Sequence, residues 1–172
     1  MRDLEQIKNQ TVLVVGDMMV DKYILGTVSR ISPEAPVPVL HQQEVQRKLG
    51  GAGNVVVNLV SLGAKVRVIG RVGDDAEGMF FRQNLSDLNV DNRYIFIEGS
   101  TITKTRVSAS NQQFIRIDEE TVTMPSKDVM ERITSEMNTI LSGITVVILS
   151  DYAKGFLTED LTQRIITAAK KR

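Results

Sequence analysis

Three runs of apolar and β-branched residues recur along the chain, and each is closed by glycine or aspartate. They occupy residues 11–17 (TVLVVGD), 65–73 (KVRVIGRVG) and 144–151 (ITVVILSD). Apolar runs of this length are typical of strands that are buried on both faces, as in parallel sheets covered by helices. The pattern therefore predicts three buried strands that are widely spaced in the sequence.

Helical periodicity fills the intervals between these strands. Phe81, Leu85 and Leu88 recur at helical spacing after the acidic opening GDDAEG, and a second periodic stretch runs through residues 130–141 after Ser126, a predicted N-cap. The alternation of strands with helices predicts an α/β fold in which a parallel sheet is flanked by helices.

The segment 55–62 can be interpreted in two ways. Its three consecutive valines favour a strand by propensity, whereas Val56, Leu59 and Val60 lie at helical spacing. We interpret the segment as a helix.

Two stretches, residues 23–45 and 93–118, interrupt the alternation. The first contains three prolines, which exclude a helix and confine any strand to the edge of a sheet. The second alternates polar and apolar residues around turns predicted at residues 98–100 and 110–111. Together the two stretches predict short antiparallel strands that form a small inserted β lid over a binding site.

Composition excludes several classes of protein. A chain of 172 residues with 42% hydrophobic and 24% charged residues is expected to form one globular domain, here residues 1–172. Its formal net charge is zero, so neither nucleic acid nor an anionic membrane is an expected partner. Cysteine is absent, which excludes thiolate chemistry. The polar N-terminal residues carry no signal-peptide pattern, and we expect a cytoplasmic protein with small-molecule ligands.

The glycine-rich stretch GGAGN at residues 50–54 resembles a phosphate-binding loop only superficially. A dinucleotide fingerprint requires a third glycine where Val56 stands and an apolar strand directly before the loop, but QRKL precedes it. A P-loop would end in Gly-Lys-Ser or Gly-Lys-Thr, which does not occur. A tight turn with close packing under a helix and a loop that contacts a different ligand both remain open.

Acidic side chains follow all three predicted strands. These are Asp17 with Asp21, Asp74 with Asp75, and Asp151. Ligands of open α/β sheets bind outside the carboxyl ends of the strands, where carboxylates repel phosphate but accept hydrogen bonds from sugar hydroxyls. The sequence therefore favours a polyol ligand beside the GGAGN turn, with helix caps or turns as the alternative role of each aspartate.

These motifs resemble those of a known family. The stretch GGAGNVVVNLVSLGAKVRVIGRVGDDAEG is similar to the first signature region of the ribokinase-like (PfkB) carbohydrate kinases, and VVGDMMVD is similar to their sugar-binding first strand. The stretches SRISPEAPVPVL, TITKTRV, NQQFIRID and LSDYAKGFLT resemble the subfamily that acts on D-glycero-β-D-manno-heptose 7-phosphate. The resemblance implies phosphorylation of the anomeric hydroxyl on the way to ADP-heptose for lipopolysaccharide, with ATP and Mg²⁺ in the complete enzyme.

The resemblance also implies roles for residues near the first strand. Asp17 and Asp21 match the carboxylates that hold sugar hydroxyls. Gly50, Gly51 and Asn54 match the loop that closes around the sugar. The lid of this family can also act as a dimer clasp, so a homodimer through the β lid is expected.

Further roles fall on the lid and on the third predicted strand. Asp151 and Lys154 match the strand end beside the acceptor. The substrate phosphate requires cations from the lid, for which Lys104, Arg106 and Arg116 are the candidates, with solvated lid charges as their alternative role.

The sequence departs from the family at its C-terminal side. The Gly-Ala-Gly-Asp motif that supplies the general base is absent, as is the Asn-x-x-Glu segment associated with magnesium. We therefore expect the chain to be the N-terminal half of a kinase, with no catalytic base or metal ligand of its own. The alternatives are a catalytically silent sugar-phosphate-binding or dimerisation module and a PfkB kinase for another sugar.

Overall fold

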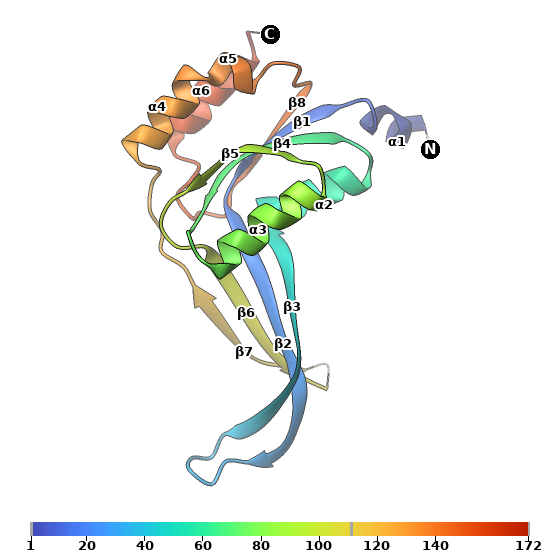
Figure 1. The fold of residues 1–172 in the computed structure, drawn as a ribbon, viewed down its shortest axis with the longest axis vertical. Coiled ribbons are helices and arrows are strands. Elements are labelled where there is room, and N and C mark those ends of the chain that lie inside the picture. Colours follow the sequence, from blue (N-terminus) through green and yellow to red (C-terminus); the bar gives the residue numbers. More distant parts are fainter. Residues whose placement is uncertain (1, 111, 172) are drawn as a thin grey trace.

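The computed structural model describes residues 2–110 and 112–171, which form an α/β body and a long β lid (Figure 1). The body contains a four-stranded parallel sheet in the order β5-β4-β1-β8. Its strands are β1 (Thr11–Gly16), β4 (Lys65–Val72), β5 (Asp91–Ile97) and β8 (Val146–Ser150). The three strands predicted from apolar runs are therefore confirmed.

Helices cover both faces of the body sheet. Val12 and Val14 of β1 pack in one core with α2 and α3, and Leu13 and Val15 pack in a second core with α4 and α6. This arrangement explains why β1 is apolar at consecutive positions. The helices are α1 (Arg2–Ile7), α2 (Ala52–Ser61), α3 (Ala76–Asp87), α4 (Lys127–Ser135), α5 (Met137–Ile140) and α6 (Glu159–Ala169).

Several helix predictions are confirmed in detail. Residues 55–62 fall in α2 and its C-cap, and Ser126 caps α4 by accepting a hydrogen bond from the backbone N–H of Val129. The periodic stretch 130–141 forms two helices instead of one, because the chain leaves regular helix at Glu136. Among the described residues, no helix is both long and apolar enough to cross a bilayer.

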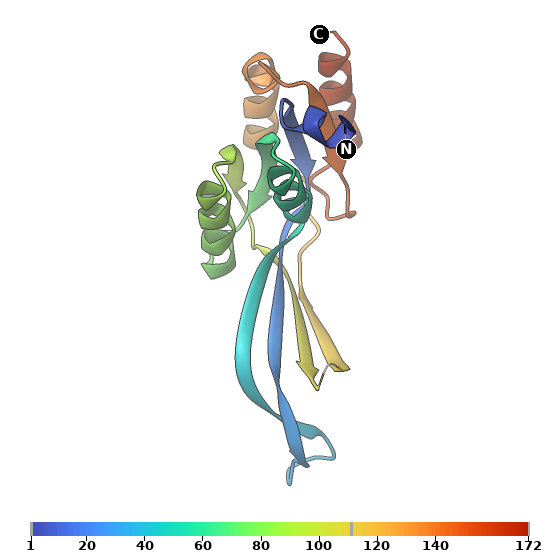
Figure 2. The same cartoon turned by 90° about the vertical axis from the view of Figure 1, so that its right-hand side faces the viewer.

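The lid is a separate four-stranded sheet in the order β3-β2-β6-β7, and it projects from one end of the body (Figure 2). The strands are β2 (Met18–Ile31), β3 (Pro38–Gly51), β6 (Ile102–Ala109) and β7 (Gln112–Glu119). The α/β fold with an inserted β lid is confirmed, and Pro38 lies on an edge strand as expected.

The predicted extent of the lid was wrong in two respects. First, the predicted segment 23–45 is too short, because β2 and β3 are long strands of 14 residues each. β2 begins almost directly after β1, and β3 continues to Gly50 and Gly51, which we call the glycine turn. Second, residues 93–97 belong to β5 of the body, where they pair in parallel with β4. Tyr94 and Phe96 pack in one body core and Ile95 packs in the other. The segment predicted as part of a lid hairpin is therefore a body strand that is buried on both faces.

The connections of the lid also differ from a simple antiparallel sheet. β2 pairs with β6 in parallel, and only the β2–β3 and β6–β7 pairs are antiparallel. The turn predicted at residues 98–100 links the body sheet to β6 and is not a hairpin turn. Of the other predicted turn, Ser110 has a φ of +49°, and Asn111 lies outside the described residues.

A carboxylate of α3, that of Glu77, anchors the base of the lid to the body. Its carboxylate lies 3.3 Å from Lys22 Nζ and 2.9 Å from Arg47 Nε. Lys22 and Arg47 are paired in register across β2 and β3, so one helix carboxylate holds both long strands. Lys22 and Arg47 therefore lie on the side of the lid that faces α3. Successive side chains of a strand point to opposite faces, so Asp21, next to Lys22 in β2, faces the other side.

Candidate functional site

The glycine turn brings main chain against the carboxylate of Asp21. A Cβ atom added to Gly50 would lie 2.5 Å from Oδ2 of Asp21 and 3.0 Å from Cγ of Met19. Gly51 is the N-cap of α2 and has a φ of +54°, which favours glycine over residues with a side chain. The two glycines therefore allow the main chain of β3 to approach the side chains of β2, including the Asp21 carboxylate, more closely than any other residue would.

Asp21 is joined to the neighbouring lid strand by an arginine. Arg106 Nη1 donates a hydrogen bond of 2.6 Å to Oδ1 of Asp21, and the guanidinium lies 5.4 Å from the ring centroid of Tyr23. The hydrogen bond to Asp21 raises the pKa of Arg106, and burial opposes this shift. The pair therefore places a carboxylate and a cation side by side at the base of the lid.

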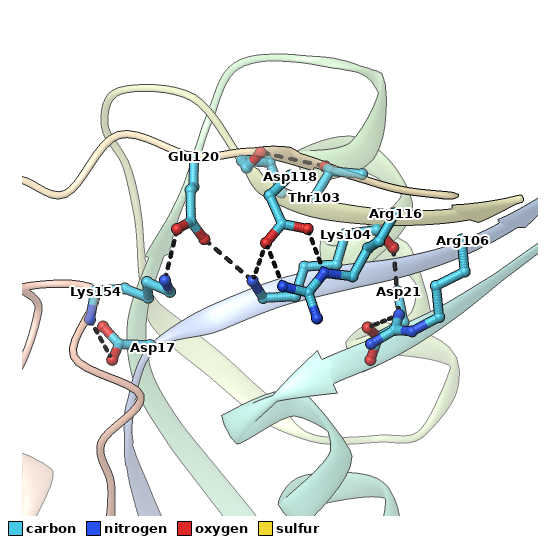
Figure 3. A network of polar contacts seen from close by, with 10 residues as sticks. Asp17, Asp21, Thr103, Lys104, Arg106, Arg116, Asp118, Glu120 and Lys154 are labelled. Carbon is cyan, nitrogen blue, oxygen red and sulfur yellow. Dashed lines mark hydrogen bonds and ion pairs between the residues drawn. The ribbon is translucent and has the colours of Figure 1, made fainter. Parts of the chain in front are cut away.

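Charged side chains of opposite sign alternate along the same face of the lid (Figure 3). Lys104 Nζ lies 3.1 Å from Oδ2 of Asp118 and 3.2 Å from Oε2 of Glu120, and Arg116 Nε lies 2.8 Å from Oδ1 of Asp118. Because Asp21, Lys104 and Asp118 are in register across three strands, their side chains point to one face. We call Lys104, Arg116, Asp118, Glu120 and Lys154 the charged row.

Both acids of the charged row are held as carboxylates. Hydrogen bonds from Arg116 and Lys104 lower the pKa of Asp118. The hydrogen bond from Lys154 is the main cause of the lowered pKa of Glu120, with burial opposing it and Lys104 reinforcing it. Three cations thus face two carboxylates, and the row carries an excess positive charge.

The loop between β8 and α6 contributes Lys154 to this row. Lys154 Nζ lies 2.7 Å from Oε1 of Glu120. Asp151 directly follows β8 and is exposed, and its Oδ1 accepts a 2.8 Å hydrogen bond from the backbone N–H of Ala153. Asp151 therefore closes a tight turn in which Ala153 has a φ of +56°.

Asp17 lies beneath that loop and is only 2% exposed. Its Oδ2 accepts hydrogen bonds from the backbone N–H groups of Tyr152 at 2.9 Å and Lys154 at 3.1 Å, and its Oδ1 accepts one from Phe156 at 3.2 Å. Both oxygens are thus engaged by the protein, so the two aspartates predicted as a pair have different surroundings. Asp21 faces the lid, and Asp17 faces the loop after β8.

Arg71 is a site residue that the sequence reasoning missed. It is 9% exposed at the end of β4, and it donates to the carbonyls of Thr123, Met124 and Lys154 and to Glu98. The available signal was an arginine within the apolar end of the strand, residues 68–72 (VIGRV), where burial of a charge requires partners. A cavity of about 150 Å³ adjoins Arg71 and Asp17, and its lining also includes Met18, Ile102, Thr121 and Phe156.

The remaining candidates lie outside the charged row. Asn54 is exposed on the first turn of α2 and lines a groove with Arg47 and Lys48. Asp74 is exposed, and Asp75 is the N-cap of α3. Burial acts to raise the pKa of Asp75, but hydrogen bonds from Thr101 and from the backbone N–H of Gly78 outweigh it and lower the pKa. Asp75 therefore fills the alternative role of helix cap.

The site offers no evident cage for a metal ion. Within residues 2–110 and 112–171, no group of three or more His, Cys, Asp or Glu side chains is arranged to hold a cation. The acids of the site are instead each engaged by a lysine, an arginine or backbone N–H groups. The chemistry available to these residues is recognition of hydroxyls and anions.

Curated relatives match almost the whole chain. It is 41% identical to "Bifunctional protein HldE" of Helicobacter hepaticus over 96% of the chain and 43% identical to the protein of that name in Magnetococcus marinus over 92%. The "Bifunctional protein HldE" of Helicobacter pylori strain Shi470 is 44% identical over 93% of the chain. The chain spans only 34% to 35% of the length of these relatives.

Solved structures share the fold at low sequence identity. A putative phosphofructokinase from Staphylococcus aureus superposes with a TM-score of 0.71 at 14% identity, and an Arabidopsis thaliana ribokinase in complex with ribose and ATP gives 0.64 at 20%. In each case 94% of this chain covers 50% of the solved chain. Residues 9–172 match the pfkB family of carbohydrate kinases, and the chain therefore belongs to that family.

Proposed function

We propose that this chain forms the sugar-binding part of a kinase that phosphorylates D-glycero-β-D-manno-heptose 7-phosphate at its anomeric hydroxyl, as a step toward ADP-heptose. Membership of the pfkB family supports the reaction class. The identities of 41% to 44% to proteins named HldE, together with the heptose kinase motifs of the lid and of the loop after β8, support the substrate. In this proposal, parts of the protein outside this chain bind ATP and supply the general base.

One observation carries this proposal. A carboxylate that contacts a glycine turn and a row with excess positive charge lie on the same face of the lid. A phosphorylated sugar presents hydroxyl donors at one end and a dianion at the other. Hydroxyls require acceptors such as Asp21, and the phosphate requires cations such as Lys104 and Arg116.

Different residues of the site would then bind different parts of the substrate. Asp21 accepts hydrogen bonds from sugar hydroxyls, and Gly50 leaves room for its carboxylate because it has no side chain. Lys104, Arg106 and Arg116 bind the phosphate from the lid. Asp151 limits the site at the end of β8, and Lys154 extends from the loop after β8 toward the charged row. Together these contacts hold the sugar in one orientation and exclude water from its reactive end.

The phosphoryl donor is assigned to ATP with Mg²⁺ in the complete protein. When bound, the nucleotide supplies the γ-phosphoryl group and the metal neutralises its charge. Among the described residues, no group of three or more His, Cys, Asp or Glu side chains could hold a metal ion. The Gly-Ala-Gly-Asp and Asn-x-x-Glu motifs that this family uses for the general base and for magnesium do not occur in the chain, so we assign neither role to its residues.

Titration calorimetry with three ligands tests the proposal. The chain should bind heptose 7-phosphate more tightly than unphosphorylated heptose, and both more tightly than ATP. Binding of ATP without binding of either sugar would contradict it. Equal affinities for the two heptoses would show that the chain does not recognise the phosphate of the substrate. If the sugar phosphate binds but the complete protein does not phosphorylate it, the chain is a catalytically silent binding module.

We also propose that the lid mediates a homodimer. On the lid a groove of about 420 Å³ is apolar, and Phe114 and Ile115 of edge strand β7 are 47% and 54% exposed. Apolar groups on an edge strand favour association with a second sheet. The groove is lined by Val28, Val37, Pro38, Leu40, Val107, Phe114 and Ile115. A second copy of the chain offers the same groove and edge, as a two-fold interface requires.

A further inference from the structure

A single carboxylate bridges two lysines that come from different parts of the fold. Glu120, just after β7, accepts from Lys154 Nζ at 2.7 Å through Oε1 and from Lys104 Nζ at 3.2 Å through Oε2. The two ammonium groups are thus already spaced so that one anion with two oxygens spans them. A phosphate monoester also presents several anionic oxygens from one centre and can form the same pair of contacts.

Lys154 is fixed at this position through its own backbone. Its N–H donates to Asp17 Oδ2 at 3.1 Å, and its carbonyl accepts from Arg71 Nη2 at 3.4 Å. Asp17 and Arg71 are 2% and 9% exposed, so both contacts are made inside the protein. The backbone of Lys154 is held from both sides, which leaves its side chain free to extend toward the lid.

The shape of the loop reinforces this hold. Ala153 and Gly155, on either side of Lys154, have φ values of +56° and +90°. A Cβ atom on Gly155 would lie 2.3 Å from the carbonyl oxygen of Thr123, which is itself bound by Arg71. Conformations of this kind persist only where the surroundings enforce them. Asp17 and Arg71 supply that enforcement on the two sides of the loop.

We propose that Lys104 and Lys154 form a two-lysine clamp for the substrate's phosphate, that Glu120 occupies the clamp in the absence of ligand, and that Asp17 and Arg71 are positioning residues for Lys154. This inference rests on the proposed function for the identity of the anion, a sugar monophosphate. It changes the role expected of Asp17 from a ligand of sugar hydroxyls to a support of the loop. It also gives Glu120 a role as an internal competitor of the substrate.

The decisive variant is Glu120→Gln, which removes the competing charge and retains the size of the side chain. Calorimetry with heptose 7-phosphate should show about tenfold tighter binding than the unsubstituted chain, while affinity for unphosphorylated heptose stays unchanged. Glu119→Gln is the matched control, because Glu119 is an exposed neighbour that pairs in register with Thr103 instead of Lys104. Unchanged or weaker binding by a folded Glu120→Gln variant would overturn the clamp.

Asp17→Asn tests the positioning role. It should weaken binding of heptose 7-phosphate by about tenfold and leave unphosphorylated heptose bound as before, because the loss acts through Lys154. Lys154→Met should show the same selective loss without disturbing the buried contacts. A loss by Asp17→Asn that is equal for both sugars would assign Asp17 to direct sugar binding or to folding and would contradict the positioning role.

Inorganic phosphate separates this inference from the proposed function. The side-chain ammonium signals of Lys104 and Lys154 can be followed by nuclear magnetic resonance during a phosphate titration. Shifts of both signals, saturating at lower phosphate in Glu120→Gln, would support the clamp even if heptose 7-phosphate failed to bind and the proposed substrate were wrong. Phosphate that shifts neither signal, in a chain that binds heptose 7-phosphate, would refute the clamp and leave the proposed function standing.

Discussion

Asp21 and Arg106 form a hydrogen bond of 2.6 Å across two adjacent parallel strands of the lid. The contact joins the carboxylate that we assign to the sugar with a cation that we assign to its phosphate. Arg106 also lies over Tyr23, so its guanidinium retains a partner if the carboxylate is changed. The two functions of the site can therefore be separated by substitution at Asp21.

Asp21→Asn should reduce affinity for both phosphorylated and unphosphorylated heptose. Losing a charge-assisted hydrogen bond costs about 1.5 to 3 kcal/mol, and calorimetry on the folded variant can measure it. Asp160→Asn is a suitable control because Asp160 also pairs with an arginine, Arg164, but on the exposed surface of α6. Comparable losses from both variants would argue against a role for Asp21 in binding.

Gly50→Ala should impair sugar binding through the position of Asp21. The new methyl group would lie 2.5 Å from Asp21 Oδ2, so the carboxylate must move, and overpacking of this kind costs about 1 to 3 kcal/mol of stability. Calorimetry and thermal unfolding together measure the two effects.

The control for Gly50→Ala is Gly143→Ala. No atom lies within 4 Å of the added methyl group there, but the φ of +73° disfavours a side chain. This variant should lose stability and retain full sugar affinity. If Gly50→Ala also retained full affinity, the close approach of the glycine turn to Asp21 would have a structural role only.

The sequence predicted the body of the fold because its signals are local. The apolar run of β1 is apolar at consecutive positions since its two faces pack in two different cores. The interpretation of β5 was wrong because the turn predicted at residues 98–100 made residues 93–97 look like one arm of a lid hairpin. Only the parallel pairing of β5 with β4 shows that residues 93–97 form a strand of the body and not part of a lid hairpin.

The site was predictable in its residue types but not in its contacts. Asp17 and Asp21 are four positions apart, and no local pattern indicates that one lies beneath the loop 152–156 and the other faces Arg106. Arg71 was missed for the same reason. Its partners at residues 98, 123, 124 and 154 are remote in the sequence and meet only through the fold.

Acid should weaken the charged row. The pKa values of Asp118 and Glu120 are lowered in the folded protein, so these groups bind fewer protons folded than unfolded. Their contribution to stability is therefore fully present above the ordinary carboxyl range near pH 4.3 and is lost as the pH falls through the lowered values. The difference in melting temperature between the unsubstituted chain and Glu120→Gln should shrink from pH 7 to pH 3. A difference that stayed constant over this range would exclude the ionic contribution.

Ile115→Lys should convert the expected dimer to a monomer without affecting the sugar site. Ile115 is 54% exposed and lines the apolar groove, so a lysine there would bury a charge in the interface but remain solvated on a monomer. Met79→Lys is the matched control, since Met79 is 57% exposed on α3, away from the groove. Sedimentation velocity at micromolar concentration should show a dimer for the unsubstituted chain and for Met79→Lys, and a monomer for Ile115→Lys. A monomer in all three cases would mean that the lid groove is not a self-association surface, and dissociation by Met79→Lys alone would move the interface to α3.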